Sequence, residues 1–327
     1  MKADVLSDVL RAVRLTGAVY FDFELSAPWA LDTPPAREIA GVVMPGAQRV
    51  IEYHVVARGS GWAQVLNRPP IRLGEGDLLI FPQGDAHVLS SAPGLPAPRE
   101  PSAFVRASPT LPMRYERGGG GSEHTHIVCS FLGLDERPYN PLLTALPQVI
   151  HLASHGAGAS AGWLGTLMGV AIDESRVDRP GSENVLARLS ELLLVEAVRR
   201  YLETLPPAET GWLAGLRDPV VGQALAAMHA GPRSPWTVDD LARQAGVSRS
   251  VFAERFTEMV GQPPMQYLAL WRMQLASRLL VDGAHVAAVA GAVGYESEAA
   301  FSRAFKKLVG EAPAAWRRRH GRIAGSS

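Results

Sequence analysis

The spacing of apolar residues changes twice along this chain of 327 residues, and each change marks a different kind of structure. Residues 3–15 carry apolar side chains at helical spacing, at Val5, Leu6, Val9, Leu10 and Val13. From Val19 to Leu152 the apolar runs are short and Gly and Pro are frequent, which is typical of strands and turns. Helical spacing returns after Ser160. The pattern therefore predicts a short N-terminal helix, a β-rich region and a long helical region.

The β-rich region contains four segments with strand character: Arg49–Ala57, Gly61–Leu66, Asp77–Phe81 and His124–Phe131. Short, evenly spaced strands separated by turn signals are typical of an all-β barrel or sandwich. The run GGGGS at Gly118–Ser122 is interpreted as a flexible connection between two of the strands.

The segment Ser182–Leu205 predicts a long helix that is capped by Ser182 and ends before Pro206 and Pro207. A wide apolar face follows Val185, Leu189, Leu192 or Leu193, and Glu196 or Ala197. Such a face fits ordinary core packing or the seam of a dimer, and both alternatives stay open. The segment Pro206–Pro219 is expected to be a boundary.

The last hundred residues contain one helix-turn-helix pattern twice, at Thr237–Gly261 and His285–Gly310. In each copy a short helix and a Gly turn lead to a Ser, and the helix after it carries two Phe residues four positions apart. These pairs are Phe252 and Phe256 after Ser248, and Phe301 and Phe305 after Ser297. Since residues i and i+4 share a helical face, each pair is expected to be buried, which leaves the opposite face free for a DNA major groove.

Local signals support the boundaries of these helices. Thr237 and Asp240 have the spacing of a capping box, and Ser248 is expected to cap a helix whose buried face includes Val251. Exposed positions of the two second helices are the candidates for base and phosphate contacts. These DNA-binding candidates are Arg249, Ser250, Ala253, Glu254, Thr257, Ser297, Glu298, Ala299, Ser302, Arg303 and Lys306. The segment Pro264–Gly283 predicts a connecting helix of about 27 Å, which can hold two recognition helices roughly one DNA turn, ~34 Å, apart.

Charge is distributed unevenly although the net charge of the chain is zero. From Asp218 onward there are 13 Lys and Arg residues and 9 Asp and Glu residues, a net charge of +4. The first 217 residues carry 19 and 23, a net charge of −4. The C-terminal part is therefore expected to face phosphates.

Three features of the sequence bear on the cellular compartment of the protein. The single cysteine excludes an internal disulfide framework. The N-terminal segment carries acidic residues and no continuous apolar run, so we expect no signal peptide. No segment is long and apolar enough to span a membrane. We therefore expect a cytoplasmic protein.

Residues 220–320 resemble the DNA-binding domain of AraC/XylS-type regulators. The resemblance rests on WTVDDLARQAGVSRSVFAERFTEMVGQPPMQYLALWRM and VGYESEAAFSRAFKKLVGEAPAAWR. It implies two helix-turn-helix motifs bridged by one long helix, consecutive major grooves as targets, and RNA polymerase as a partner. Carried over position by position, it implies base reading by Ser250, Ala253, Glu254, Thr257, Glu298, Ala299, Ser302 and Arg303.

The β-rich region resembles the cupins. The second cupin motif, G-x5-P-x-G-x2-H-x3-N, matches at Gly76, Pro82, Gly84 and His87, with Ser91 in place of Asn. The first motif ends in E-x6-G, which fits Glu52–Gly59, but the two histidines that should precede Glu52 are absent. The resemblance implies a sensor domain, because many AraC-type regulators carry a cupin-like domain at the N-terminus.

Four residues are candidates for an effector site in this barrel. Glu52 and His54 are two residues apart on one strand, so both are expected to point into the barrel. His87 stands at the ligand position of the second motif, and Cys129 lies on a later strand.

Two alternatives remain for the chemistry of this site. A metal site of His54, His87 and Cys129, with His126 as a further ligand candidate, suits zinc or another divalent metal, and the thiol also suits oxidant sensing. His124 and His126 rank below the other three, because His126 and Cys129 should face opposite sides of a regular strand. Otherwise the barrel binds no metal, and His54 and His87 either hydrogen-bond a small organic effector or are ordinary core residues.

The sequence thus predicts an α+β protein with three parts. These are a cupin-like sensor domain over residues 1–155, a helical linker and candidate dimerisation region over 156–217, and a double helix-turn-helix domain over 218–322. We expect a homodimeric, sequence-specific transcription regulator that binds promoter DNA and a small-molecule, metal or oxidant effector, and not an enzyme. The alternative is a metal-dependent cupin enzyme that carries a DNA-binding domain.

Overall fold

Strand β3 (Arg49–Arg58) is buried on both faces along most of its length and lies inside a six-stranded sheet. In this computed structural model the described residues are 4–12, 15–45, 47, 49–98, 113–134, 139–154, 160–177, 179–206 and 210–321. The sheet has the order β10-β6-β3-β9-β1-β8, and a second sheet of four strands has the order β2-β7-β4-β5. The other strands are β1 (Leu15–Ser26), β2 (Ala30–Thr33), β4 (Gly61–Val65), β5 (Ile71–Leu73), β6 (Leu78–Phe81), β7 (His87–Ser90), β8 (Met113–Gly118), β9 (His124–Leu134) and β10 (Ile150–Leu152). All four predicted strands are present.

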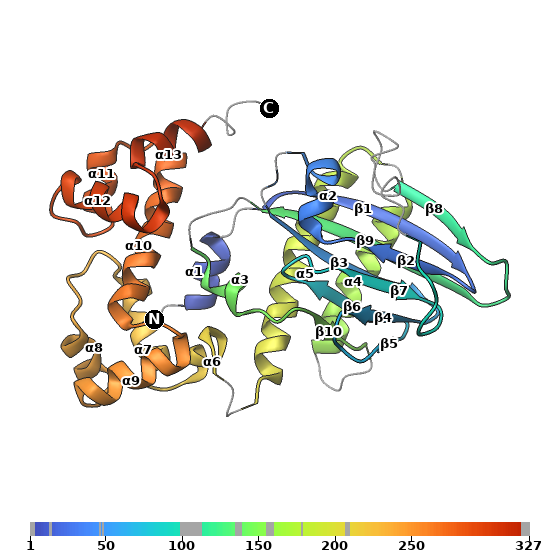
Figure 1. Ribbon diagram of the computed structural model, residues 1–327, viewed down its shortest axis with the longest axis horizontal. Helices are drawn as coiled ribbons and strands as arrows, with labels where there is room; N and C mark the ends of the chain where they lie inside the picture. The colour runs from blue at the N-terminus through green and yellow to red at the C-terminus, as the bar shows by residue number, and fades with distance from the viewer. Residues whose placement is uncertain are drawn as a thin grey trace. The chain divides into compact units, whose positions relative to one another are not determined.

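The two sheets share an aromatic-rich core, to which β1, β6 and β9 contribute Phe21, Phe81 and Phe131. The other face of the six-stranded sheet is covered by helices, as Figure 1 shows for α4 (Ser160–Arg176) and α5 (Ser182–Thr204). There the hydroxyl groups of Tyr20 and Tyr53 bond the Ser190 hydroxyl of α5, at 2.8 Å for Tyr53. A further helix, α2 (Ala36–Val43), contacts β3. The strand pattern predicted a barrel or sandwich, and the structure has two sheets that enclose one core.

The glycine run between β8 and β9 forms a turn that lies directly against β1 and the residue after it. The amide of Gly119 donates to the Ser26 carbonyl at 2.9 Å, and that of Gly121 to the Ala27 carbonyl at 2.8 Å. A Cβ atom at Gly118, whose φ is +137°, would lie 1.9 Å from the Ser26 oxygen, and one at Gly121 2.4 Å from the Ala27 oxygen. These glycines therefore permit close packing, in contrast to the flexible connection expected from composition.

The C-terminal region is all-helical, as predicted. Its helices are α6 (Trp212–Arg217), α7 (Val221–Ala230), α8 (Val238–Gln244), α9 (Arg249–Val260), α10 (Pro264–Val281), α11 (Val286–Ala292), α12 (Glu298–Val309) and α13 (Pro313–His320). The pairs α8–α9 and α11–α12 are the two helix-turn-helix motifs, and α10 connects them. The helix predicted over residues 3–15 is α1 (Val5–Ala12), which packs against α7 and α3 (Pro141–Ala145), and α3 in turn contacts α6.

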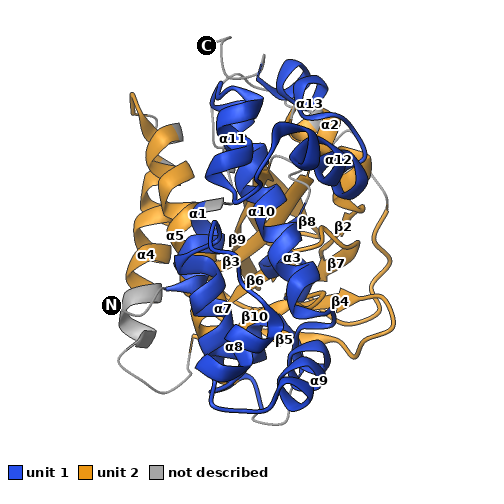
Figure 2. Ribbon diagram, turned by 90° about the vertical axis from the view of Figure 1, so that its left-hand side faces the viewer, with its two compact units in different colours: residues 1–13, 137–145, 205–327 blue, residues 14–136, 146–204 orange. Residues whose placement is uncertain are grey.

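Contacts divide the chain into two units, coloured separately in Figure 2. One comprises residues 1–13, 137–145 and 205–327, and the other comprises residues 14–136 and 146–204. In this division α1 and α3 belong with the C-terminal helices, whereas α4 and α5 belong with the barrel. The three domains with boundaries at 155 and 217 stay a prediction. Among the described helices none is both long and apolar enough to cross a membrane.

Candidate functional site

Three buried side chains converge inside the barrel: Glu52 and His54 from β3, and His87 from β7. Alternation along β3 points Glu52 and His54 to the same face, as their spacing predicted. The Nε2 atoms of His54 and His87 lie 2.7 Å apart, and Glu52 Oε2 lies 4.0 Å from His87 Nε2. One ligand atom from each of the three residues falls within 4.8 Å of the other two. This is a cluster of the donor types that divalent transition metals take.

The hydrogen bond of the second ring nitrogen fixes the tautomer of His87. Its Nδ1 lies 2.8 Å from the carbonyl oxygen of Asp85, which can only accept, so neutral His87 directs an unprotonated Nε2 into the cluster. Metal-ligating histidines are usually oriented in this way. The ring of Phe81 stacks on that of His87 at 3.7 Å and holds its plane. No sequence pattern singled out Asp85 or Phe81, because one acts through its backbone and the other looks like ordinary core.

Burial disfavours charge throughout the cluster. It raises the pKa of Glu52 well above its ordinary value, with a further contribution from Asp85. It lowers the pKa of His54 well below the ordinary value, with the neighbouring His87 adding to the effect. Burial also lowers the pKa of His87 to about 4. Both histidines are therefore neutral near pH 7. Because His87 Nε2 accepts, the His54 Nε2–H donates in their 2.7 Å contact, and His54 can bind a metal through Nε2 once its proton moves to Nδ1 or is released.

Both carboxyl oxygens of Glu52 are buried without a hydrogen-bond partner among the described residues. An unsatisfied buried polar group costs about 1–3 kcal/mol. A positive ion between this carboxyl group and the two imidazoles would satisfy it.

Cys129 contacts the cluster from the side of His54. It lies directly opposite His54 in the pairing of β9 with β3, and its Sγ is 2.8 Å from His54 Nδ1. That nitrogen is the one turned away from His87, so Cys129 orients His54 and is not placed beside the other donor atoms. Burial raises the pKa of the thiol well above its ordinary value, with Glu52 and Asp22 adding to the effect. The thiol is therefore protonated near pH 7.

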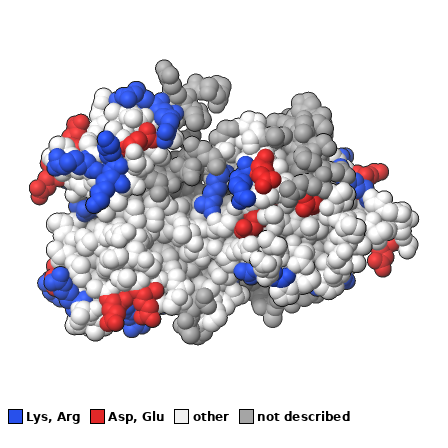
Figure 3. All heavy atoms as spheres, viewed as in Figure 1, with Lys and Arg blue, Asp and Glu red and all other residues white. Residues whose placement is uncertain are grey.

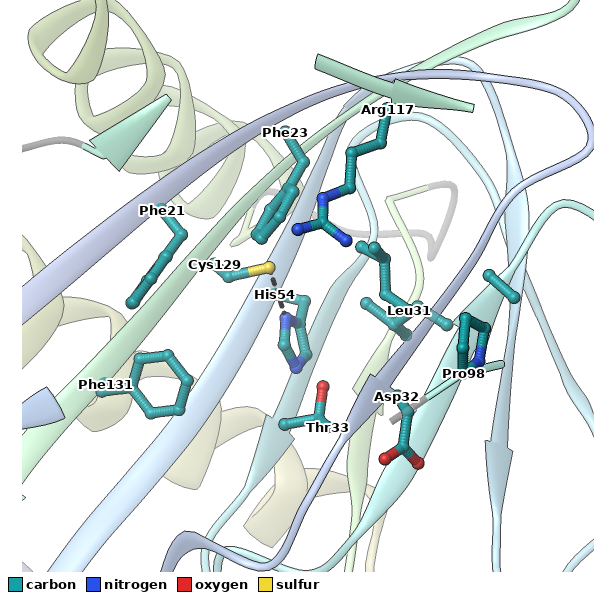
Figure 4. Close-up of a pocket in the computed structure, with 12 residues that line it drawn as sticks. Phe21, Phe23, Leu31, Asp32, Thr33, His54, Pro98, Arg117, Cys129 and Phe131 are labelled. Carbon is teal, nitrogen blue, oxygen red and sulfur yellow. Dashed lines mark hydrogen bonds between the residues drawn. The ribbon is translucent and has the colours of Figure 1, made fainter. Parts of the chain in front are cut away.

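A small cavity of about 40 Å³ adjoins Cys129 and His54 (Figure 4). Its wall is mostly apolar, with Phe21, Phe23 and Leu31 among the lining residues, and Arg117 reaches the same space. A cavity of about 10–15 Å³ holds one water molecule, so this volume suits a few waters or a very small ligand.

His126 and His124 lie outside this cluster. The register of β9 turns His126 to the face opposite that of Cys129, where its Nε2 bonds Asp22 and its Nδ1 lies 3.9 Å from Glu24. His124 is exposed at the start of the strand. Of the metal ligand set expected from sequence, the cluster thus keeps His54 and His87, leaves out Cys129 and His126, and adds Glu52.

In the helical unit, the caps of the helix-turn-helix motifs form as expected. The Ser248 hydroxyl accepts from the Val251 amide, and the Ser297 hydroxyl accepts from the Ala300 amide. Both hydrogen bonds of the Thr237 capping box are present. Recognition helices α9 and α12 therefore begin where the sequence placed them.

The four phenylalanines of α9 and α12 are fully buried. Val251 was expected beside them, but its side chain is 49% exposed. The prediction was wrong because Val251 lies one position, about 100° of helical rotation, away from Phe252.

Most DNA-binding candidates are accessible. Ala253 and Ser302 are half-buried, and the exposed ones are Arg249, Ser250, Glu254, Thr257, Ser297, Glu298, Ala299, Arg303 and Lys306. Figure 3 shows Lys and Arg side chains gathered over α12 and α13, with a few acidic side chains between them. Base reading by individual residues stays a prediction.

Two family models match the chain: one described as Cupin over residues 4–203, and one described as Helix-turn-helix domain over residues 241–319. An AraC-like transcription regulator of Streptomyces lividans is 34% identical over 96% of this chain and 98% of its own length. The HTH-type transcriptional regulator AlkR of Acinetobacter baylyi is 31% identical over 96% and 99%. The DNA-binding domain of AdpA, solved with a target DNA, is 32% identical, with 33% of this chain and 99% of that domain covered and a TM-score of 0.32.

Proposed function

The chain belongs to the AraC-like transcription regulators, with a cupin domain ahead of a DNA-binding helix-turn-helix domain, and from this premise we propose that a divalent transition metal bound in the barrel controls its binding to promoter DNA. The observation that carries the proposal is the convergence of Glu52, His54 and His87 on one buried point. Two imidazoles and a carboxylate form a known zinc ligand set with an open position. When bound, the metal would supply a fixed positive charge and a coordination position for a small ligand.

Two observations favour a metal over the other effectors. Because the raised pKa of Cys129 keeps its thiol protonated, this cysteine is a poor nucleophile toward an oxidant or electrophile. A cavity of about 40 Å³ is too small for most organic effectors unless the barrel rearranges. Neither oxidant sensing by Cys129 nor binding of an organic effector would give a role to the carboxyl oxygens of Glu52, which have no hydrogen-bond partner among the described residues.

The remaining partners follow from the family and the surface. We infer a homodimer, because Val185 and Leu192 of α5 are 43% and 45% exposed and lie seven residues apart on one helical face. Val170 of α4 is also exposed. As a promoter-binding regulator the protein would act in the cytoplasm together with RNA polymerase, and the regulator function leaves the cupin-enzyme alternative without support.

Coupling between the barrel and DNA should appear as a metal-dependent affinity. Zinc-loaded and EDTA-treated full-length protein are expected to differ at least about five-fold in Kd for a promoter fragment recovered by genomic selection, since allosteric coupling usually amounts to 5–150-fold. His87→Ala should remove the difference and His126→Gln should retain it. Equal affinities for the two wild-type forms would refute control by the metal.

Arg303 is expected to read a base from α12. Arg303→Ala should weaken binding to the selected fragment by about 1–3 kcal/mol, as measured by fluorescence anisotropy. Binding to a scrambled duplex should change less. Equal losses on both duplexes would instead make Arg303 a phosphate contact.

A further inference from the structure

Helix α13 carries three consecutive arginines that neither helix-turn-helix motif uses: Arg317, Arg318 and Arg319. Its opposite face is fixed, because Trp316 is buried in the core of the second motif, with its ring 6.1 Å from that of Phe305. Arg318 and Arg319 are exposed. The position of this basic end is thus set by the same core that positions the recognition helix α12.

The basic end lies beside the turn that leads into α11. Arg317 donates to the carbonyl oxygen of Ala284 at 3.4 Å, and Ala284 directly precedes His285, the N-cap of α11. A groove of about 750 Å³ runs between this turn and α13, and it is lined by Gly283 and the three arginines. In a helix-turn-helix protein the first helix crosses the DNA backbone while the second enters the major groove. Since α11 is that first helix, the phosphate backbone should pass the turn and therefore α13.

The two motifs also differ in charge, and the difference favours contact of the second motif with phosphates. Residues 237–261 contain three Lys and Arg residues and four Asp and Glu residues, whereas residues 285–310 contain three and two, and residues 311–320 add three and one. In the first motif Arg255 bonds Asp218 at 2.6 Å, so part of its basic charge is neutralised internally. At the groove of α13, Glu311 bonds Arg319 and Asp282 lies 3.9 Å from Arg278. Even with these two carboxylates, the α13 side carries the excess of positive charge.

We propose that Arg318 and Arg319 at the end of α13, with Arg317 holding the adjacent turn, form a phosphate-binding surface that anchors the DNA backbone next to the second motif. The proposal rests on the DNA-binding function and adds a contact outside both recognition helices. Its energetic contribution is independent of sequence, because phosphates are the same along any duplex. DNA attachment is then asymmetric, with the second motif and α13 providing most of the electrostatic affinity.

The test uses the full-length protein and a mixed-sequence duplex of about 30 bp, which covers two recognition helices one turn apart and their flanks. Each phosphate contact contributes about 0.9 to the slope of log K against log salt concentration. The double variant Arg318→Gln/Arg319→Gln is expected to reduce the magnitude of the slope by about 2 and the affinity about ten-fold or more near 0.1 M salt. Arg318→Lys/Arg319→Lys should keep most of the slope.

Arg188→Gln serves as the matched control, because Arg188 is likewise exposed and paired with a carboxylate, that of Glu191, but lies on α5. It should leave the slope unchanged. An unchanged slope in the double glutamine variant would overturn the proposal. If the wild-type protein did not bind the duplex, the DNA-binding function itself would fail, which is a distinguishable result.

Discussion

Replacing Phe305 with alanine is expected to lower the free energy of unfolding of the helical unit by about 3–5 kcal/mol, the usual cost of removing a buried phenylalanine ring. Phe305 has no exposed surface, and its ring lies 5.5 Å from that of Phe301 and 6.1 Å from that of Trp316. Without this ring both α12 and α13 would lose packing contacts, so the affinity for DNA should fall together with the free energy of unfolding.

Urea unfolding of the full chain, followed by circular dichroism, measures this effect. Phe256→Ala, in the equivalent position of the first motif, should cost a similar amount because that ring is equally buried. Val251→Ala is the contrasting control: its exposure predicts a change within about 0.5 kcal/mol. A loss at Val251 as large as that at Phe305 would contradict the arrangement of these helices.

Replacing Glu52 with methionine is expected to change stability in opposite directions with and without metal. In the presence of EDTA the variant should be more stable than the wild type by about 1–3 kcal/mol, because an unsatisfied buried carboxyl group is removed. With excess zinc the order should reverse. A ligand at 1,000 times its Kd stabilises the wild type by about 4 kcal/mol, and the variant lacks one ligand.

Thermal unfolding with EDTA and with zinc shows both effects in one series. Glu24→Met is the control, because Glu24 lies on the outer face of the sheet and its side chain is 44% exposed. It should respond to zinc as the wild type does. If Glu52→Met destabilised the metal-free chain, the carboxyl group would have a structural partner and the metal site would lose its main support.

The helix-turn-helix motifs could be predicted closely because their signals are local. The caps at Thr237, Ser248 and Ser297 and the paired phenylalanines lie within a few residues of the helices they define. The error at Val251 arose because an apolar residue beside a buried ring was assigned to the same face. Helical geometry alone separates the two positions.

The barrel site could be predicted only in part. The alternation of side chains along a strand predicted that Glu52 and His54 share a face and that His126 and Cys129 do not. The second cupin motif identified His87. The contact between His54 and His87 joins strands of two different sheets, and no local pattern encodes that pairing. For the same reason Glu52 was assigned to an effector site, while the metal ligand set was completed with cysteine.

Strands buried on both faces were also difficult to predict. β1 turns Phe21 and Phe23 to the core and Tyr20 and Asp22 to the other face of the sheet, so it lacks the alternation of apolar and polar residues that marks a half-exposed strand. The glycine run after β8 was ambiguous for a related reason. Composition cannot distinguish a loose connection from a turn packed against Ser26 and Ala27.

The most direct test of metal control is the metal content of full-length protein purified without chelators or affinity metals, determined by plasma mass spectrometry. The account predicts about one zinc or similar ion per chain in the wild type and in His126→Gln, as expected for a site with three protein ligands. It predicts loss of that ion in His87→Ala. A wild-type protein that contains no metal, and that takes up none when zinc, copper, nickel and iron are offered in turn, would contradict it.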